Sequence, residues 1–173
     1  MKKLLLLLLF IPLVSFGQLT YKDVMSINSD KQFVRVMIEN NYELNDKEDG
    51  YITYGYEIDR DSIEGNKSTK WGYYSLSDGE FTFSFSRNSS LNSFLPIFDE
   101  DALEKEGLKP KSEYDLIVED IKKNCTFYNV ITKNNGEKEF DYSCYSCSES
   151  KYKGKIGFMI SEGLGVIKHF IKD

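Results

Sequence analysis

Hydrophobic and polar residues alternate in several short segments, which is the pattern of a β-strand with one buried face. In residues 81–86 three phenylalanines alternate with threonine and serine, and residues 156–160 place isoleucine or phenylalanine at every second position. Asp78 and Gly79 precede the first of these segments, and an Asp-Gly pair between alternating runs is typical of a hairpin turn. The pattern therefore predicts antiparallel strands joined by tight turns.

Two other segments repeat their apolar residues at the three- and four-residue spacing of an amphipathic helix. Ser29 lies three residues before Gln32, and Ser112 three residues before Asp115, so each segment begins with a helix N-cap signal. Shorter helical stretches are expected before them, at about residues 21–26 and 101–106. The two apolar faces comprise Phe33, Val34, Met37, Ile38 and Tyr42 in the first helix, and Tyr114, Ile117, Val118, Ile121 and Cys125 in the second.

The same order of elements occurs twice along the chain, which suggests an internal duplication. Residues 38–42 align with residues 121–125, and residues 70–74 align with residues 155–159. We therefore predict an α+β fold of two tandem helix-plus-three-strand repeats, which form one antiparallel sheet with the helices packed on one face. The predicted bounds are about residues 20–88 for repeat one, about 99–173 for repeat two, and about 95–111 for the joint between them.

This layout resembles the tandem-repeat architecture of the β-lactamase-inhibitor-protein-like fold, which small exported bacterial binding and envelope-assembly proteins share. The resemblance rests on the order of elements in both halves and on no signature motif. It implies a sheet face that grips another protein. Because one fold supports many functions, the resemblance assigns no binding residue to this chain.

The first 17 residues have the pattern of an export signal. Lys2 and Lys3 form a basic start, an apolar run extends over residues 4–14, and small residues occupy positions 15 and 17. We predict cleavage before Gln18, which leaves one domain of residues 18–173 in the periplasm or outside the cell. The apolar run is shorter than the about 20 residues of a membrane span, and no later stretch approaches that length.

The chain carries a formal net charge of −6 and contains 12 tyrosines, 12 phenylalanines and one tryptophan. A negative protein repels nucleic acid and anionic membrane surfaces, so neither is expected as a partner. The aromatic residues favour strands.

Three cysteines are the most reactive side chains of the sequence. Cys144 and Cys147 have C-x-x-C spacing, and with Cys125 and His169 they would complete four zinc ligands. The strand alternation around Cys144 argues against zinc, because it sends the two cysteines to opposite faces. The repeat alignment instead places Cys125 and Cys144 where repeat one has two tyrosines. We predict a Cys125–Cys144 disulfide with Cys147 as the odd thiol, and reduced thiols, zinc and redox catalysis stay open as alternatives.

Motifs of known catalytic sites are missing, since no G-x-S-x-G, H-E-x-x-H or phosphate-binding glycine loop occurs. His169 is the sole histidine, and we expect an ordinary strand residue. The acidic residues 59–64 lack the spacing of a calcium-binding EF-hand loop, and those at 99–101 are expected to face water. We therefore expect neither a metal nor a cofactor.

The remaining candidate for function is the sheet face that the helices leave uncovered. Tyrosine combines apolar area with a polar tip and suits recognition, although tyrosine and threonine also favour exposed strand positions by β-propensity alone. The predicted binding residues of this face are Tyr51, Thr53, Tyr74, Thr82, Ser84 and Tyr145.

The favoured hypothesis is an exported, non-catalytic module that binds another protein or a glycan of the cell envelope. Two alternatives remain from the sequence. One is an envelope hydrolase with an unrecognised carboxylate site, and the other is a structural protein whose chains are joined by a disulfide through Cys147.

Overall fold

The computed structural model describes residues 18–48, 50–63, 65–87, 111–134, 136, 138–151 and 154–170. The predicted export signal, the predicted helix at 101–106 and residues 95–110 of the predicted joint lie outside these ranges. Within them the chain forms three helices and eight strands. These elements are α1 (Tyr21–Ser26), α2 (Asp30–Glu39), β1 (Tyr42–Glu48), β2 (Tyr51–Tyr56), β3 (Lys70–Ser75), β4 (Phe81–Ser86), α4 (Glu113–Asn124), β5 (Thr126–Asn134), β6 (Glu139–Ser146), β7 (Lys155–Ser161) and β8 (Leu164–Phe170).

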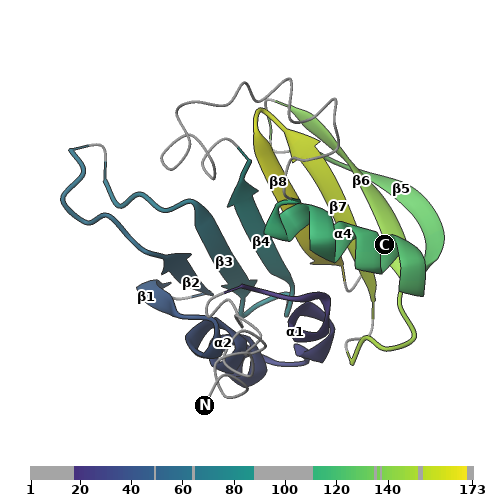
Figure 1. Cartoon of the computed structure of the whole chain (residues 1–173), viewed down its shortest axis with the longest axis horizontal. Coiled ribbons are helices and arrows are strands. Elements are labelled where there is room, and N and C mark those ends of the chain that lie inside the picture. Colours follow the sequence, from purple (N-terminus) through teal and green to yellow (C-terminus); the bar gives the residue numbers. More distant parts are fainter. Residues whose placement is uncertain are drawn as a thin grey trace, which may run out of the picture.

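All eight strands belong to one antiparallel sheet, in the order β1-β2-β3-β4-β8-β7-β6-β5 (Figure 1). The two halves of the chain meet at β4 and β8, and each half runs outward to its own first strand. The predicted α+β class and the single antiparallel sheet are therefore confirmed. No helix of the described part is long and apolar enough to cross a membrane.

Each half contributes four strands, so the prediction of three per half is wrong. The strands that the sequence pattern missed are β1 and β5, which form the two edges of the sheet. Most of their residues are exposed on both faces, so no two-residue hydrophobic period marks them. Tyr42 and Cys125, which the pattern added to the helices, begin β1 and cap the end of α4.

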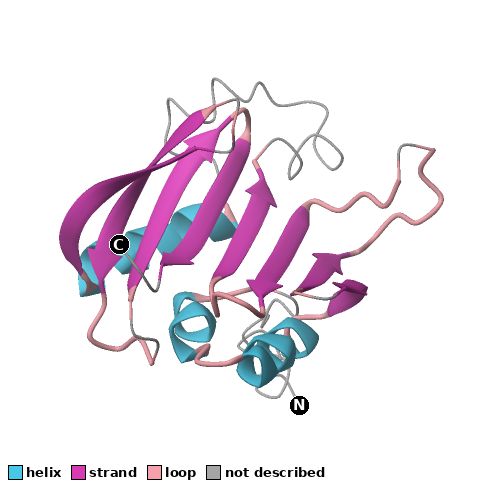
Figure 2. Ribbon diagram, turned by 180° about the vertical axis from the view of Figure 1, so that it is seen from behind, coloured by secondary structure: helices cyan, strands magenta, loops and turns pink. Residues whose placement is uncertain are grey.

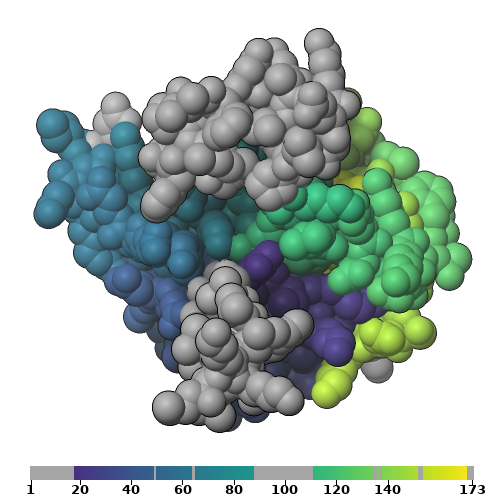
Figure 3. All heavy atoms as spheres, in the orientation of Figure 1, coloured from purple at the N-terminus to yellow at the C-terminus, as the bar shows by residue number. Residues whose placement is uncertain are grey.

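The helices pack on one side of the sheet, and Figures 1 and 3 show this side, with α4 in front of the strands. Figure 2 shows the opposite side, where strands of the second half stand in front of α4, and α1 and α2 are seen below the ends of the strands. Helix α2 packs against β1 and β3, and α4 packs against β8. The main hydrophobic core fills the space between this side and the helices. We call the two sides of the sheet the helix face and the open face.

Both long helices begin where the sequence indicates. The Ser29 side chain accepts a hydrogen bond from the Gln32 backbone N–H, and Ser112 forms a reciprocal capping box with Asp115. The buried residues of α2 are Phe33, Val36 and Met37, and those of α4 are Tyr114, Ile117, Val118 and Ile121.

Two strand glycines let these helices approach the sheet. A Cβ atom on Gly72 would lie 2.5 Å from Met37 Sδ of α2, and one on Gly165 would lie 2.6 Å from the Tyr114 ring of α4. A glycine in a strand interior often marks such a close approach.

Candidate functional site

The strand register decides which side chains occupy the open face. Tyr54 pairs with Gly72, which in turn pairs with Phe83, and Tyr54 and Phe83 belong to the main core. Their neighbours along each strand therefore project from the opposite side, because successive residues of a strand alternate between faces. In β2, β3 and β4 these neighbours are Tyr51, Thr53, Trp71, Tyr73, Thr82 and Ser84.

An aromatic group occupies the open face of the first half. The rings of Tyr51 and Tyr73 are stacked with centroids 5.4 Å apart, and the side chain of Tyr73 is 39% exposed. A Cβ atom on Gly55 would lie 2.8 Å from Cζ3 of Trp71, so the absence of a side chain there makes room for the indole. We call Tyr51, Trp71 and Tyr73 the aromatic row.

The Tyr51 phenol is hydrogen-bonded to a carboxylate. Its Oη donates to Glu48 Oε2 at 2.5 Å, and this bond to a carboxylate raises the pKa of Tyr51 to about 12. The aromatic row therefore presents uncharged rings with hydroxyl groups beside them. Thr53 pairs with Tyr73, and Tyr73 pairs with Thr82, so threonines flank the row on both neighbouring strands.

The open face of the second half is a smaller hydrophobic cluster. Tyr142, Cys144, Val166 and Phe170 are buried there, with Ile131, Phe140 and Met159 packed against them. Gly157 provides the space for Phe170, because a Cβ atom on it would lie 2.7 Å from that ring. The two ends of the open face thus differ, since the first presents partly exposed aromatic rings and the second has buried most of its apolar groups.

Two of the predicted binding residues are on the wrong face. Tyr74 is 6% exposed and its ring lies 5.4 Å from that of Phe33 of α2, and Tyr145 packs against the main core with its ring stacked on Phe158. The prediction for Tyr74 depended on aligning it with Met159, which does lie on the open face. A one-residue slip in an alignment exchanges the two faces of a strand, and this slip caused the error.

Tyr51, Thr53, Thr82 and Ser84 lie on the open face, and their role in binding stays a prediction. Trp71 and Tyr73 were missed. A glycine between large residues indicates a close approach on its face of the strand, but Gly55 and Gly157 make room for side chains of the open face, so Gly72 alone does not identify the face of its neighbours. With Gly72 on the helix face, its neighbours Trp71 and Tyr73 must lie on the open face.

The disulfide joins Cys125 to Cys147, with the Cα atoms 4.5 Å apart, so the predicted Cys125–Cys144 bond is wrong. Thr126 pairs with Ser146 at the end of the β5–β6 ladder. Cys125 precedes Thr126 and Cys147 follows Ser146, so the two cysteines lie next to each other. Cys144 is instead a buried cysteine of the open-face cluster and lies outside the disulfide. It cannot reach Cys125 because it projects from the other side of the sheet.

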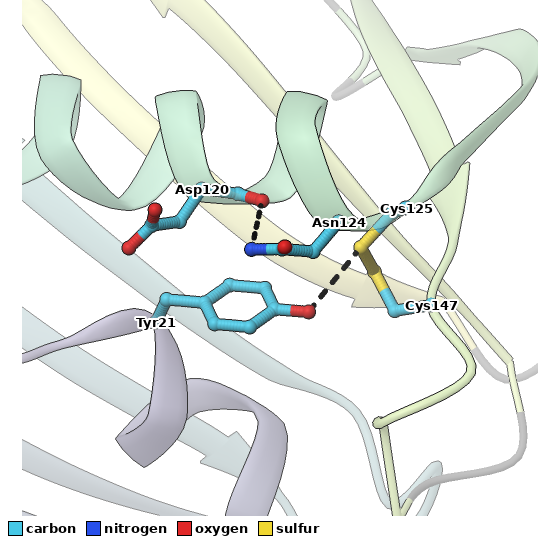
Figure 4. The surroundings of a disulfide bond; sticks show 5 residues. All are labelled: Tyr21, Asp120, Asn124, Cys125 and Cys147. Carbon is cyan, nitrogen blue, oxygen red and sulfur yellow. Dashed lines mark hydrogen bonds between the residues drawn. A yellow bond between two sulfur atoms is a disulfide. The ribbon is translucent and has the colours of Figure 1, made fainter.

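The disulfide lies beside a small cavity of about 450 Å³. Figure 4 shows Tyr21 of α1 pointing at the disulfide, with its Oη 3.6 Å from Cys125 Sγ. The hydroxyl is the donor, because a disulfide sulfur carries no proton. Burial raises the pKa of Tyr21, and the carboxylates of Glu149 and Asp120 add to this effect. The cavity is lined by Thr20, Tyr21, Lys22, Asp120, Asn124 and Glu149.

The alternative of zinc ligation by these residues does not fit this geometry. Cys125 and Cys147 are bonded to each other, so neither offers a thiolate. His169 lies on the helix face with its ring 5.1 Å from that of Phe81, and burial lowers its pKa to about 4. Among the described residues no three histidine, cysteine or acidic side chains form a group that could hold a metal ion.

A partly buried ion pair connects the halves on the helix face. Lys70 Nζ of β3 lies 2.5 Å from Glu113 Oε2 of α4, and the backbone N–H of Leu19 donates to the other carboxylate oxygen at 2.6 Å. Burial raises the pKa of Glu113, while Lys70 acts in the opposite direction. The pair ties the start of the described chain to both halves, and it lies on the side of the sheet opposite the aromatic row.

No protein-family model, no curated protein and no solved structure matches this chain.

Proposed function

We propose that this protein is an exported, non-catalytic binding module that holds another protein on the open face of its sheet. The observation that carries the proposal is the aromatic row, which is partly exposed on a face that no described helix covers. Aromatic residues are enriched in protein interfaces, because a large ring loses little conformational entropy when it is buried. The row suits a flat partner surface, since the sheet supplies an extended platform.

The hydroxyl groups around the row add specificity. Thr53, Thr82 and Ser84 lie on the same face as the rings and offer both donors and acceptors. A glycan could use the same stacking and hydroxyl chemistry, and the crosslinking experiment below distinguishes the two kinds of partner.

The proposal is tested by site-specific photo-crosslinking in the producing cell. A photoreactive phenylalanine analogue at Tyr73 should yield a discrete adduct that proteases degrade. The matched control is Leu116 of α4, which is 41% exposed against 39% for Tyr73. No adduct at Tyr73, or equal adducts at both positions, would refute the proposal, and an adduct sensitive only to glycosidases would transfer it to a glycan.

Export is part of this proposal. The Cys125–Cys147 disulfide is compatible with an oxidising compartment, where such bonds persist. The measurement is the N-terminal sequence of the protein recovered outside the cytoplasm, which should begin at Gln18. A product that retains Met1 and stays in the cytoplasm would contradict export.

The two alternative functions find less support. The acidic residues at 99–101 lie outside the described residues, and Glu113 is already engaged by Lys70 and Leu19. A structural protein joined through Cys147 would need that thiol to be free, whereas it is bonded to Cys125.

We also infer that the two halves arose by duplication of a unit of one long helix and four strands. The order α2–β1–β2–β3–β4 recurs as α4–β5–β6–β7–β8, and the sheet order is mirrored about the β4–β8 pair. Tyr42 pairs with Tyr56 at the open end of the first hairpin, where the second hairpin has its disulfide. If the hairpins are equivalent, the double variant Tyr42→Cys/Tyr56→Cys forms a second disulfide, and failure to form one in the folded protein would count against equivalence. A relationship to the β-lactamase-inhibitor-protein-like fold stays a proposal of the same kind.

A further inference from the structure

The two edges of the sheet differ in charge. Strand β1 carries Glu43, Asp46, Lys47 and Glu48, whereas Lys133 is the only charged residue of β5. Natural sheets protect their edges with charges and bulges, because unpaired backbone groups at an edge pair readily with another strand. Each edge strand here contains a bulge, and only β1 adds the charges.

Side chains from the β2–β3 connection also protect β1. Arg60 Nη2 donates to the Leu44 carbonyl oxygen at 3.1 Å and lies 3.6 Å from Glu43 Oε2. Asn66 donates to the Asn45 side chain at 2.8 Å. A strand that approached β1 would have to displace Arg60 and would meet three acidic side chains.

Strand β5 offers a more open template. After the bulge, where the Asn129 side chain accepts a hydrogen bond from the Val130 N–H, residues 130–134 pair with β6 without interruption. Figures 1 and 2 show β5 as the outermost strand, bent with β6 at its end of the sheet, and no described element lies beyond it. Phe127, Tyr128 and Val130 are 55%, 50% and 47% exposed.

We propose that two copies of this protein associate through their β5 strands, which pair antiparallel across a two-fold axis near Thr132. This inference concerns self-association and is independent of the partner proposed for the open face. A second copy fits the edge because the register about Thr132 places Lys133 opposite Ile131 of the other copy. No like charges then lie directly opposite each other, and the two Lys133 side chains are diagonal neighbours in a complex of chains whose net charge is −6 each. A copy that paired through β1 would first have to displace Arg60 from the Leu44 carbonyl oxygen.

Sedimentation velocity of the disulfide-bonded protein, from micromolar to millimolar concentration, tests the association. We expect a concentration-dependent dimer that Val130→Lys weakens by about tenfold or more, because it adds a charge to the paired edge. The matched control is Leu44→Lys on β1, which is 48% exposed against 47% for Val130 and should leave the dimer unchanged. A monomer at every concentration, or a dimer that only Leu44→Lys weakens, would overturn the proposal.

A second measurement covers the case in which Val130→Lys disturbs folding. Thr132 is exposed and lies at the proposed axis, so Thr132→Cys places two thiols opposite each other, and a short bis-maleimide should link them. Leu44→Cys on the other edge should give no linked dimer, and the wild type reports any contribution from Cys144. Equal linking of the two variants, or none for Thr132→Cys, would contradict pairing at this axis.

Discussion

The open ends of the two outer hairpins are held in different ways. In the β1–β2 hairpin Tyr42 pairs with Tyr56, and their ring centroids lie 5.6 Å apart. In the β5–β6 hairpin the corresponding place is occupied by the Cys125–Cys147 disulfide. One hairpin thus uses aromatic packing and the other uses a covalent bond.

The difference follows from how much each hairpin is buried. Helix α2 packs against both β1 and β3, and Tyr42 belongs to the main core. Strand β5 is exposed along nearly its whole length. The helix of the second half, α4, packs mainly against β8 and α1. A hairpin with little buried apolar surface is marginally stable by itself, so a cross-link replaces the missing packing.

Removal of the disulfide is expected to have the largest effect. The double variant Cys125→Ala/Cys147→Ala should lose about 3 kcal/mol of unfolding free energy, because the bond joins residues separated by 22 positions. Urea unfolding monitored by the fluorescence of Trp71 measures the loss, and hydrogen exchange should show it mainly in β5 and β6. The reduced wild type is the control. An unchanged midpoint on reduction would contradict the role given to the bond.

The two glycines beneath the helices sharpen the comparison of the halves. Gly165→Ala should cost about 2 kcal/mol, because Tyr114 cannot move away while its hydroxyl donates to the Met159 carbonyl oxygen at 2.9 Å. Gly72→Ala should cost about 1 kcal/mol or less, because the nearest atom is the sulfur of the flexible Met37 side chain. Thermal and urea unfolding measure both. Equal losses of unfolding free energy would show that Tyr114 of α4 moves aside as easily as Met37 of α2.

The smallest effects are expected from two tyrosine hydroxyls, and their signs should differ. Tyr42 Oη is buried without a hydrogen-bond partner among the described residues, and burial raises its pKa. Tyr42→Phe should therefore stabilise the protein by about 1 kcal/mol, whereas Tyr114→Phe loses the bond to Met159 and should destabilise it by about 1 kcal/mol. Urea unfolding of both variants provides the test, and a destabilised Tyr42→Phe would indicate an unrecognised partner for that hydroxyl.

The helices and the inner strands could be predicted from the sequence because their burial leaves a period. Serine caps and apolar faces located α2 and α4, and the alternating phenylalanines located β4. The edge strands could not be found in this way. Water contacts both of their faces, so hydrophobic burial does not constrain which residues they use.

The sequence by itself determined an α+β chain with amphipathic helices and antiparallel strands, since these depend on local spacing. Only the tertiary structure decided the pairing of Cys125 with Cys147 and the exposure of Trp71 and Tyr73. Both depend on strand register, and a shift of one residue moves a side chain to the other face of the sheet. The register is set by the buried face and the turns of the whole sheet, and on that face Gly72 and Gly165 leave room for the helices.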